Sequence, residues 1–538
     1  MNGSEGRDRR AVRHVAPAGA PDAGVLPERP HAVVVGGGIA GLAAATGLAE
    51  RGVRVTLVEQ ESYLGGRVGG WTEAGGQADA RPMSRGFHAF FRQYYNLRAL
   101  LRRADPGLDR LVPLADYPLV DRDGHRDSFR GLPRTPPWNA MAFALRSPTF
   151  RPRDLRALNA AAAAPLAAVS VPRVYQQLDH VDAETFLRRI NFPPAARHLA
   201  FEVFSRSFFA APSRMSAAEL AAMFHIYFLG SSEGLMFDVP DAGFDVALWE
   251  PLRAYLSARD VEVRTGTSVS AIEPGGRRHF QIDIEGGVLD ADAVVLATDV
   301  RGLQAIVGRS PGLADPAWRN QVGGLGTAPP FLVQRLWLDR PVAPDRTAFL
   351  ATGGLDPLDN ISVLDRYDRQ AQDWRRTHGG SVVELHAYAA PGDPGAPPAP
   401  ALLTGTVARL HELYPETAPA RVLAESVQWR ADCPMFGVGD YAGRPRVRTP
   451  FPGLVLAGDG VRIDLPVALM ERAASTGWHA ANCLLARWGL LGHELWSVPT
   501  RGRLAPLRWL ATRVPSPQPL APEPRPQQPP KALQEVSR

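Results

Sequence analysis

Lysine is nearly absent from this chain, and arginine takes its place. The 538 residues contain one lysine, Lys531, so the formal net charge of +5 is carried by arginine. The arginines are scattered along the sequence and form no continuous basic stripe of the kind that nucleic-acid-binding proteins carry. We therefore expect no nucleic-acid partner. The 45% hydrophobic and 21% charged fractions are those of an ordinary globular protein.

Cysteine is scarce too. Cys433 and Cys483 are the only two cysteines, and so few thiols in a chain of this length favour reduced side chains in the cytoplasm over a disulfide. No group of cysteines and histidines has the spacing of a metal site. The sequence therefore predicts neither a disulfide framework nor a bound metal.

Long apolar runs are also missing. The longest candidate, residues 157–172, is shorter than the ~20 residues that a membrane-spanning helix needs, and Pro165 interrupts it. The N-terminal residues include arginines but lack the apolar segment of a secretory signal. We expect a cytoplasmic protein without a membrane span. Contact with a membrane surface or a hydrophobic partner stays open.

The chain is long enough for roughly two to four domains. Three stretches in which apolar strands alternate with helices predict one α/β nucleotide-binding domain, and the two stretches between them predict an inserted α+β substrate domain. Both ends of the chain are polar and rich in proline, so we expect disordered tails. The expected boundaries are 1–29 (tail), 30–105, 240–310 and 441–490 (nucleotide-binding domain), 106–239 and 311–440 (substrate domain, first helical and then strand-rich), 491–514 (a C-terminal helix, either docked on the protein or in contact with a membrane) and 515–538 (tail).

Residues 33–60, VVVGGGIAGLAAATGLAERGVRVTLVEQ, contain the first candidate site. Gly36, Gly38 and Gly41 have the spacing G-x-G-x-x-G, directly after an apolar strand and at the start of a helix. The first glycine permits a tight turn, the second lets a pyrophosphate approach the backbone, and the third lets the helix pack closely on the strand. Glu59 ends the next strand, where an acid binds the adenosine ribose. This βαβ unit predicts a dinucleotide site.

Two further loops indicate which dinucleotide binds. Gly65, Gly66 and Arg67 form a glycine loop with a fixed cation, and Gly458 and Asp459 follow another apolar strand. This order resembles the FAD-binding motifs of the flavin amine oxidase and carotenoid desaturase superfamily. The resemblance implies a Rossmann-like FAD-binding domain of the GR2 or amine oxidase type, with FAD as cofactor; Asp459 could instead cap a helix. The residues that it places on FAD are Gly36, Gly38, Ile39, Ala40, Gly41, Glu59, Gln60, Gly65, Gly66, Arg67, Val269 (through its backbone, at the adenine), Gly458, Asp459 and Met470.

A narrower resemblance depends on elements outside these loops. SRGFHAFFRQYYNLRALLRR (84–103) and MERAASTG (470–477) are similar to two motifs of plant-type carotene desaturases. Together with DRYDRQAQDW (365–374), they look most like the actinobacterial isorenieratene synthases, a family of β-carotene desaturase/methyltransferases. The resemblance covers about residues 31–490. It departs at Arg472, where the plant-type enzymes have glycine, so their substrate path along this helix does not transfer directly.

This resemblance implies FAD-dependent aromatisation of a carotenoid end ring, with β-carotene as the expected substrate. Converting a β-ionone ring into a trimethylphenyl ring removes four hydrogens and moves one methyl group to the neighbouring carbon. FAD would accept a hydride equivalent twice per ring, and a cationic intermediate would let the methyl group migrate without an external donor. A quinone or oxygen would reoxidise the flavin. A substrate this hydrophobic implies peripheral membrane association.

No acid–base pair stands out from spacing alone, and each catalytic candidate has a plain structural alternative. His88 lies in the element that the resemblance places beside the flavin ring, so it is a candidate base or positioning group, or else a core histidine. Arg462 and Asp464 are candidates to stabilise a developing charge or take a proton, or else to form a buried salt bridge. Aromatic residues in 84–103 and 201–237 are candidate walls of a dry cavity, or else ordinary core.

Three other functions share the expected fold. A carotene desaturase or isomerase without methyl migration would carry the same motifs. A flavin amine oxidase commonly has a lysine near the flavin, and the position of the single lysine in the C-terminal tail argues against it. A non-catalytic isoprenoid-binding escort protein would have a defective flavin site, whereas the motifs here are intact.

Overall fold

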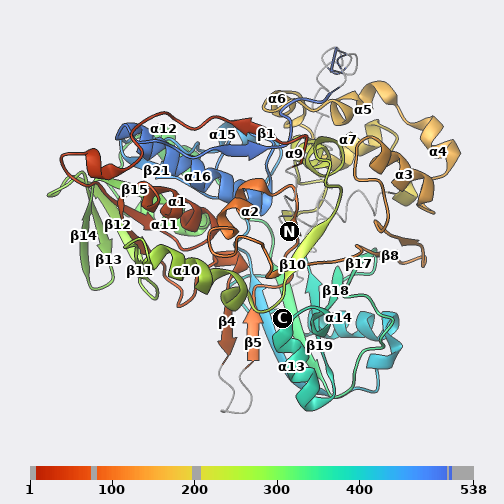
Figure 1. Cartoon of the computed structure of the whole chain (residues 1–538). Coiled ribbons are helices and arrows are strands. Elements are labelled where there is room, and N and C mark those ends of the chain that lie inside the picture. Colours follow the sequence, from red (N-terminus) through yellow and green to blue (C-terminus); the bar gives the residue numbers. More distant parts are fainter. Residues whose placement is uncertain are drawn as a thin grey trace, which may run out of the picture.

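The computed structural model describes residues 8–73, 81–196 and 208–503, together with four positions between 505 and 511. The expected tail at 515–538 and part of the aromatic stretch 201–237 lie outside the described residues. Figure 1 shows a nucleotide-binding part on the left and a second part on the right, in which helices lie above a large sheet.

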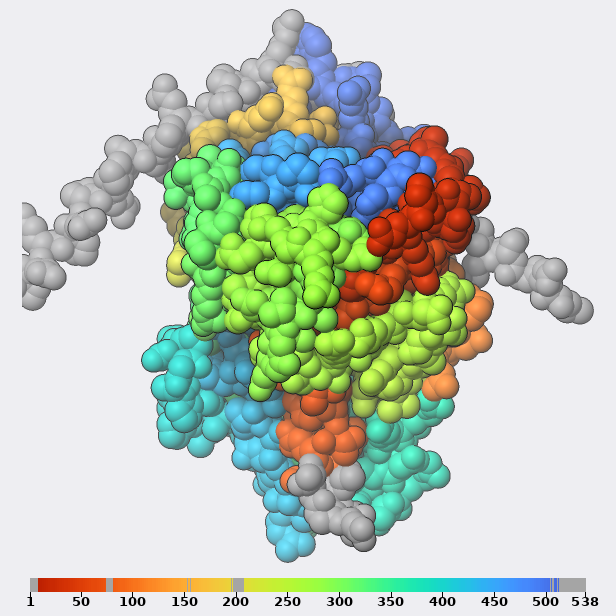
Figure 2. Space-filling view, turned by 90° about the vertical axis from the view of Figure 1, so that its left-hand side faces the viewer, coloured from red at the N-terminus to blue at the C-terminus, as the bar shows by residue number. Residues whose placement is uncertain are grey.

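Five parallel strands form the nucleotide-binding sheet, in the order β11-β3-β2-β15-β21. They come from three separate stretches of sequence, as expected, and Figure 2 shows residues of these stretches side by side on the upper half of one face. β2 is buried along its whole length, as a strand covered on both faces must be. The bounds are β2 (His31–Val35), β3 (Arg54–Val58), β11 (Glu262–Arg264), β15 (Ala293–Leu296) and β21 (Leu454–Leu456).

Helices α1 (Ile39–Ala49) and α16 (Leu469–Arg487) pack directly on each other beside this sheet (Figure 1). Small residues make this contact possible, because a Cβ atom at Gly477 would lie 2.2 Å from the carbonyl oxygen of Ala40. Both helices are therefore held at a fixed distance from the sheet and from each other.

Smaller elements surround the parallel sheet, among them an antiparallel sheet β12-β13-β14 and a second small sheet β6-β10-β7. The bounds are β12 (Val269–Pro274), β13 (Phe280–Ile284), β14 (Gly287–Ala291), β6 (Phe90–Phe91), β10 (Phe237–Pro240), β7 (Leu111–Pro113), β4 (Gly70–Glu73), β5 (Arg81–Ser84), α2 (Tyr95–Leu101), η6 (Asp245–Trp249), α10 (Glu250–Ser257), α11 (Val300–Gly308) and α12 (Pro316–Gly323).

The inserted part is α+β, as expected. Its seven-stranded sheet has the order β20-β16-β19-β18-β17-β8-β9, and only the β17–β8 pair is parallel within the described residues. The bounds are β8 (Leu119–Asp121), β9 (Arg126–Asp127), β16 (Phe331–Leu338), β17 (Phe349–Gly353), β18 (Asn360–Val363), β19 (Ser381–Ala387), β20 (Val422–Arg430), α3 (Trp138–Arg146), α4 (Pro152–Ala157), α5 (Ala160–Ala167), α6 (Arg173–Leu178), α7 (Ala183–Arg189), α9 (Ala217–Phe224), η5 (His225–Gly230), α13 (Arg369–His378), α14 (Pro400–Leu413) and α15 (Asp440–Gly443).

The expectation of a disordered N-terminal tail is wrong for residues 8–29. Strand β1 (Val12–His14) pairs antiparallel with β22 (Leu495–Ser497). The carboxylate of Asp8 is buried and accepts hydrogen bonds from the hydroxyl groups of Tyr95, at 2.7 Å, and Ser231, at 2.9 Å. Composition alone does not predict this ordered strand, because β1 forms a two-stranded sheet with a partner near the other end of the chain.

The expectation of a helix over residues 491–514 is wrong for 491–503. After β22 the chain is irregular up to residue 503, and Gly502 donates a backbone hydrogen bond to Val169 at 2.8 Å. Pro499 and Gly502 both disfavour a helix here, and the helical positions that the structure describes lie only between 505 and 511. No helix among the described residues is both long and apolar enough to span a bilayer.

We expect the fold to lose stability in acid, because two of its histidines are buried in the uncharged form. Burial lowers the pKa of His225 and of His493 to about 4, against ~6.5 in an unfolded chain. Between these values the unfolded chain takes up protons that the folded chain does not, so stability falls as the pH falls, by roughly 3 kcal/mol per histidine at pH 4.

We therefore expect the thermal midpoint to fall between pH 6.5 and pH 4, and to fall less in His225→Gln. The glutamine amide can still donate to the carbonyl oxygen of Pro499, which Nε2 of His225 contacts at 2.7 Å, but it does not titrate in this range. Thermal unfolding followed by circular dichroism measures both proteins. An equal fall in the two would contradict this origin of the acid sensitivity.

Candidate functional site

The first glycine loop brings the end of β2 to the start of α1. Gly36 has a φ of +108°, and a Cβ atom at Gly41 would lie 1.9 Å from the carbonyl oxygen of Gly36. Gly38 is the N-cap of α1, and no side chain among the described residues caps its first amides. These amides, with the positive end of the helix dipole, form a site for an anion such as a pyrophosphate.

Glu59 holds this loop in place. Its carboxylate is buried and accepts backbone hydrogen bonds from Gly37 at 2.6 Å and from Glu61 at 2.9 Å. Burial raises the pKa of Glu59 against the effect of these donors. Gln60, the next residue, is exposed. The carboxylate therefore lies at the end of β3 beside the glycine loop, where the ribose of a dinucleotide would be expected.

The second glycine loop lies against the first. Gly65 donates a backbone hydrogen bond to Gly37 at 2.9 Å. Its φ is +99°, and a Cβ atom there would lie 2.1 Å from Nε1 of Trp249. The Cα atom of Gly38 faces Gly66, whose Cβ atom would lie 3.2 Å from it. Two glycine backbones therefore meet above the start of α1, which leaves room for a phosphate group.

An ion pair between Arg67 and Asp459 connects this second loop to the loop after β21. Against the lowering effect of burial, Asp459 raises the pKa of Arg67 well above its usual range. The neighbouring Gly458 donates its backbone N–H to the hydroxyl oxygen of Thr476 in α16, at 2.9 Å. Asp459 does not cap a helix, because α16 begins at Leu469 with Ala468 as its N-cap.

The start of α16 extends past the phosphate loops. Ala40 of α1 lies against Gly477, and Gly47 of α1 lies against Ala481, so the two helices run in the same direction. At ~1.5 Å per residue, these two contacts place the start of α16 roughly 6–10 Å before the start of α1. Its second residue, Met470, is half-buried. No side chain among the described residues caps this helix start, so its first amides are available to the ring end of a dinucleotide.

The predicted FAD residues therefore come together from six separate segments and fit the cofactor. The loops at 36–41, 65–67 and 458–459 surround the start of α1. Val269 begins β12, just after Thr267, whose N–H bonds the carbonyl oxygen of Glu59 at 2.9 Å. It lies on the ribose side of the site, as an adenine contact requires.

His88 lies beyond the phosphate loops, on the strand side of the site. The Arg67 loop leads into β4, which pairs with β5 just before His88. The ring Nδ1 donates to the carbonyl oxygen of Gly86 at 2.8 Å, so Nε2 carries the lone pair. Burial lowers the pKa of His88 to about 4. The ring lines a small hollow together with Phe244, Arg335 and Glu384.

A buried polar chain on the seven-stranded sheet, which sequence reasoning missed, borders the same hollow. Glu384 accepts hydrogen bonds from Arg335 at 2.6 and 2.9 Å and contacts Nε2 of His386 at 2.7 Å. Against the effect of burial, Arg335 and His386 lower the pKa of Glu384 to about 2. The alternation of side chains along β19 predicts that Glu384 and His386 lie on the same face of the sheet. The sequence alone cannot show that this face lies against His88.

Arg462 and Asp464 form the predicted salt bridge, at 3.1 Å, although Asp464 is 34% exposed. The carboxylate of Asp464 also accepts from the hydroxyl of Tyr441 at 2.6 Å and from Arg446 at 3.0 Å. The guanidinium of Arg462 lies 4.1 Å from the centre of the Tyr441 ring. Each charge is thus engaged in a local cluster, which favours the structural interpretation of this pair over a catalytic one.

Arg472, the departure from the plant-type motif, belongs to a buried charge triad. It pairs with Glu219 at 2.8 Å, and Arg444 pairs with the other oxygen of the same carboxylate. Against the effect of burial, the two guanidinium groups lower the pKa of Glu219 to about 2. Ser216 caps α9 by accepting from the N–H of Ala218, whereas Glu219, three residues further on, turns to these arginines.

Glu471, beside Arg472, connects the two motifs of the narrower resemblance. Its carboxylate is 3% exposed and accepts backbone hydrogen bonds from Asn96 at 2.8 Å and Leu97 at 2.9 Å. The Asn96 side chain also donates to Glu471, and to the hydroxyl of Ser475 in α16, each at 2.8 Å. Burial raises the pKa of Glu471 to about 8. The start of α16 and the start of α2 are thereby held together.

This network predicts losses of different size for two substitutions of Glu471. Glu471→Ala leaves the donors of α2 unpaired in the core, so we expect a loss of about 2–4 kcal/mol in the free energy of unfolding. Glu471→Gln keeps one acceptor oxygen but turns its amide NH2 toward the donors of the other oxygen, so we expect a smaller loss of about 1–2 kcal/mol. Glu250→Ala, on the exposed side of α10, is the control. Equal losses in both Glu471 variants, measured by thermal unfolding, would contradict this assignment.

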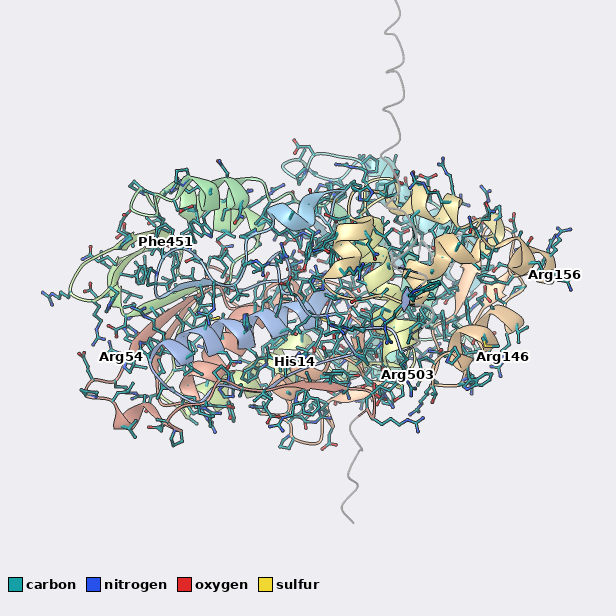
Figure 3. The ribbon with its side chains drawn as sticks, turned by 90° about the horizontal axis from the view of Figure 1, so that it is seen from above. His14, Arg54, Arg146, Arg156, Phe451 and Arg503 are labelled. Atoms are coloured by element: carbon teal, nitrogen blue, oxygen red, sulfur yellow. The ribbon has the colours of Figure 1, made fainter. Side chains whose placement is uncertain are left out.

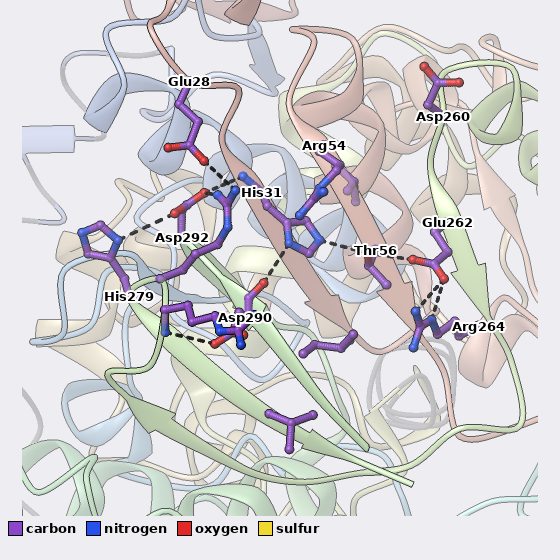
Figure 4. Close-up of a pocket in the computed structure, with 15 residues that line it drawn as sticks. Glu28, His31, Arg54, Thr56, Asp260, Glu262, Arg264, His279, Asp290 and Asp292 are labelled. Atoms are coloured by element: carbon purple, nitrogen blue, oxygen red, sulfur yellow. Dashed lines mark hydrogen bonds and ion pairs between the residues drawn. The ribbon is translucent and has the colours of Figure 1, made fainter. Parts of the chain in front are cut away.

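A larger hollow, of about 910 Å³, lies at the other end of the parallel strands from the glycine loops (Figure 4). His31, Arg54 and Glu262 line it at the amino ends of their strands. Several of its charges are paired within the wall, as Arg278 is with Asp292 and Arg264 with Glu262. Ligands of open parallel sheets bind at the carboxyl ends of the strands, so this hollow is not the dinucleotide site.

The parallel sheet, the two glycine loops and the Arg67–Asp459 pair define an FAD-dependent oxidoreductase of the dinucleotide-binding type. The chain belongs to the flavin-containing amine oxidoreductase family, whose model matches residues 39–485. The predicted fold, cofactor and enzyme class are thereby confirmed.

Comparison with known proteins gives nearer relatives. The chain is 56% identical over 506 residues to a protein named carotenoid phi-ring synthase from Streptomyces griseus, covering 94% of this chain and 97% of the relative. It is 25% identical to the zeta-carotene desaturase of Synechocystis sp., covering 84% and 96%. Among solved structures, cyclohexylamine oxidase from Brevibacterium oxydans matches with a TM-score of 0.62 and 16% identity, covering 86% and 100%, which supports the fold alone.

Proposed function

We propose that this chain aromatises β-ionone end rings of a carotene of the β-carotene type, by hydride removal and a 1,2-methyl shift. The observation that carries the proposal is the 56% identity, over nearly the whole chain, to a protein named carotenoid phi-ring synthase. A φ ring is an aromatic trimethylphenyl ring. The intact FAD loops and the position of His88 beyond them support the same chemistry.

FAD, when bound, supplies a two-electron oxidant for the ring. The chain's own residues orient the ring and accept the proton that it loses. Nε2 of His88 carries a lone pair and, with a pKa of about 4, is uncharged at neutral pH. In the proposed reaction it takes the proton that a cationic ring must lose to become aromatic. The neighbouring Phe244 ring, 5.7 Å away centre to centre, helps to keep the site dry.

The electron acceptor is proposed to be a quinone or oxygen, and the enzyme to act in the cytoplasm at a membrane surface, because its substrate dissolves in lipid. A carotene desaturase without methyl migration is the second candidate, and the 25% identity to a zeta-carotene desaturase favours it. An amine substrate is disfavoured, since no lysine occurs before position 531.

Co-expression in a host that makes β-carotene tests the proposal. We expect a pigment four or eight hydrogens lighter than β-carotene, with the same number of carbons and with aromatic ring methyl groups, after chromatography and mass spectrometry. Unchanged β-carotene, in cells that contain abundant yellow, folded protein, would defeat the proposal and point to acyclic carotenes as substrates.

A further inference from the structure

Helix α3 (Trp138–Arg146) presents an apolar face to solvent. Trp138 is 59% exposed, Met141 49% and Leu145 78%. These positions follow the spacing i, i+3 and i+7, so the three side chains lie on one side of the helix. The opposite side carries Phe143, which is buried. A surface helix normally exposes its polar face, and this one exposes large apolar groups.

Arginines surround this face. Between residues 130 and 156 the sequence has six arginines and a single acid, Asp154, and all six arginines are exposed. Figure 3 places Arg146 and Arg156 at one end of the molecule and Arg54, at the start of β3, near the other. The six are Arg130, Arg134, Arg146, Arg151, Arg153 and Arg156.

An apolar hollow lies beside the same helix. Asn139 of α3 lines it, and the Asn139 side chain donates to the carbonyl oxygen of Phe228 at 2.8 Å. The rest of its wall is mostly apolar. The apolar residues that line it include Phe129, Leu132, Phe228, Leu235 and Met236.

A series of aromatic rings joins this region to His88. Phe143 of α3 stacks on Phe129 at 4.7 Å between ring centres, and Phe129 is followed by Tyr117 at 5.8 Å. Tyr117 stacks on Phe349 at 4.9 Å, and Phe349 stacks on Phe87 at 4.4 Å. Phe87 precedes His88 in the chain. The rings form a continuous series of aromatic contacts between α3 and the candidate active site.

We propose that the exposed face of α3 docks on an anionic lipid bilayer, and that the hydrophobic substrate enters from the lipid at the hollow beside α3 and follows the aromatic rings to His88. The identity of the cargo depends on the proposed function; the docking does not. Trp138, Met141 and Leu145 would enter the apolar part of the bilayer, and the arginines would contact anionic headgroups. The same arginines would repel one another across an interface between two copies of this chain.

Vesicle sedimentation with the full-length flavoprotein tests the docking. We expect binding to phosphatidylcholine vesicles that contain phosphatidylglycerol, and about tenfold weaker binding when Trp138, Met141 and Leu145 are replaced by serine. Arg146→Gln, Arg153→Gln and Arg156→Gln together should remove the preference for phosphatidylglycerol. The matched control replaces three other exposed apolar residues by serine: Val288, Val422 and Leu423, which are 56, 47 and 49% exposed.

Equal binding by the α3 variant and the wild type would overturn the docking, as would an equal loss in the control. A change of oligomeric state in the α3 variant without loss of vesicle binding would assign the face to a second copy instead and so refute the proposal. For entry, the α3 variant should convert β-carotene in detergent micelles normally and in vesicles poorly. An equal rate from both would refute entry from lipid. A wild type that is inactive with both but binds vesicles would refute the proposed function and leave the docking standing.

Discussion

Gly41→Ala is expected to give a protein that purifies without flavin. The new Cβ atom would lie 1.9 Å from the carbonyl oxygen of Gly36, which is backbone and cannot rotate away. The loop must therefore move off the start of α1, and the amides that receive the pyrophosphate lose their positions. We expect no visible flavin absorbance in the purified variant and a product yield below detection, since the oxidant of the reaction is missing.

The control for this prediction is Gly308→Ala at the end of α11. A Cβ atom there meets no described atom within 4 Å, so the variant should bind flavin as the wild type does. Circular dichroism separates loss of flavin from loss of fold. A folded Gly41→Ala protein with the full flavin content of the wild type would contradict the position that we assign to the pyrophosphate.

His88→Phe is expected to lower the rate of product formation about 100-fold or more, the usual contribution of a general base. Phenylalanine keeps a flat ring beside Phe244 but lacks Nε2, so flavin content and thermal midpoint should change little. Because burial holds the pKa of His88 near 4, the wild-type rate should not depend on this group between pH 6 and pH 8. Initial rates at several pH values in this range measure both effects.

His378→Phe is the matched control. His378 is an exposed histidine of α13 that stacks on Trp374 at 4.6 Å between ring centres, far in sequence from the site. It should leave the rate unchanged. A His88→Phe protein with full flavin and a rate within a few fold of the wild type would remove the base from our mechanism and leave His88 as a core histidine.

The flavin site was predictable because each of its parts is a local signal. Gly36, Gly38 and Gly41 are recognisable from spacing after a strand, and Gly65, Gly66 and Arg67 from a second loop soon after it. A turn with positive φ, or a helix that touches a strand, requires glycine whatever the rest of the fold does. The apolar strands of the parallel sheet were predictable for a similar reason, since burial on both faces leaves a continuous apolar run.

The buried polar networks were not predictable, because their partners are far apart in sequence. Glu219 and Arg472 are separated by 253 positions, and nothing near either residue indicates the other. Order in residues 8–29 was missed in the same way, because β1 is stabilised by β22, at the other end of the chain. Arg472 did stand out as a departure from a motif. A lone buried charge must have a partner, and only the fold shows which.

The most direct test of the proposed aromatisation uses purified yellow enzyme, an electron acceptor and β-carotene labelled with ¹³C in the two geminal methyl groups of each ring. We expect a product four or eight hydrogens lighter that retains every labelled carbon. In each converted ring, nuclear magnetic resonance should show the two labelled methyl groups bonded to neighbouring aromatic carbons. A lighter product in which both labels remain on one ring carbon would show desaturation without migration and contradict the account, as would quantitative recovery of unchanged β-carotene.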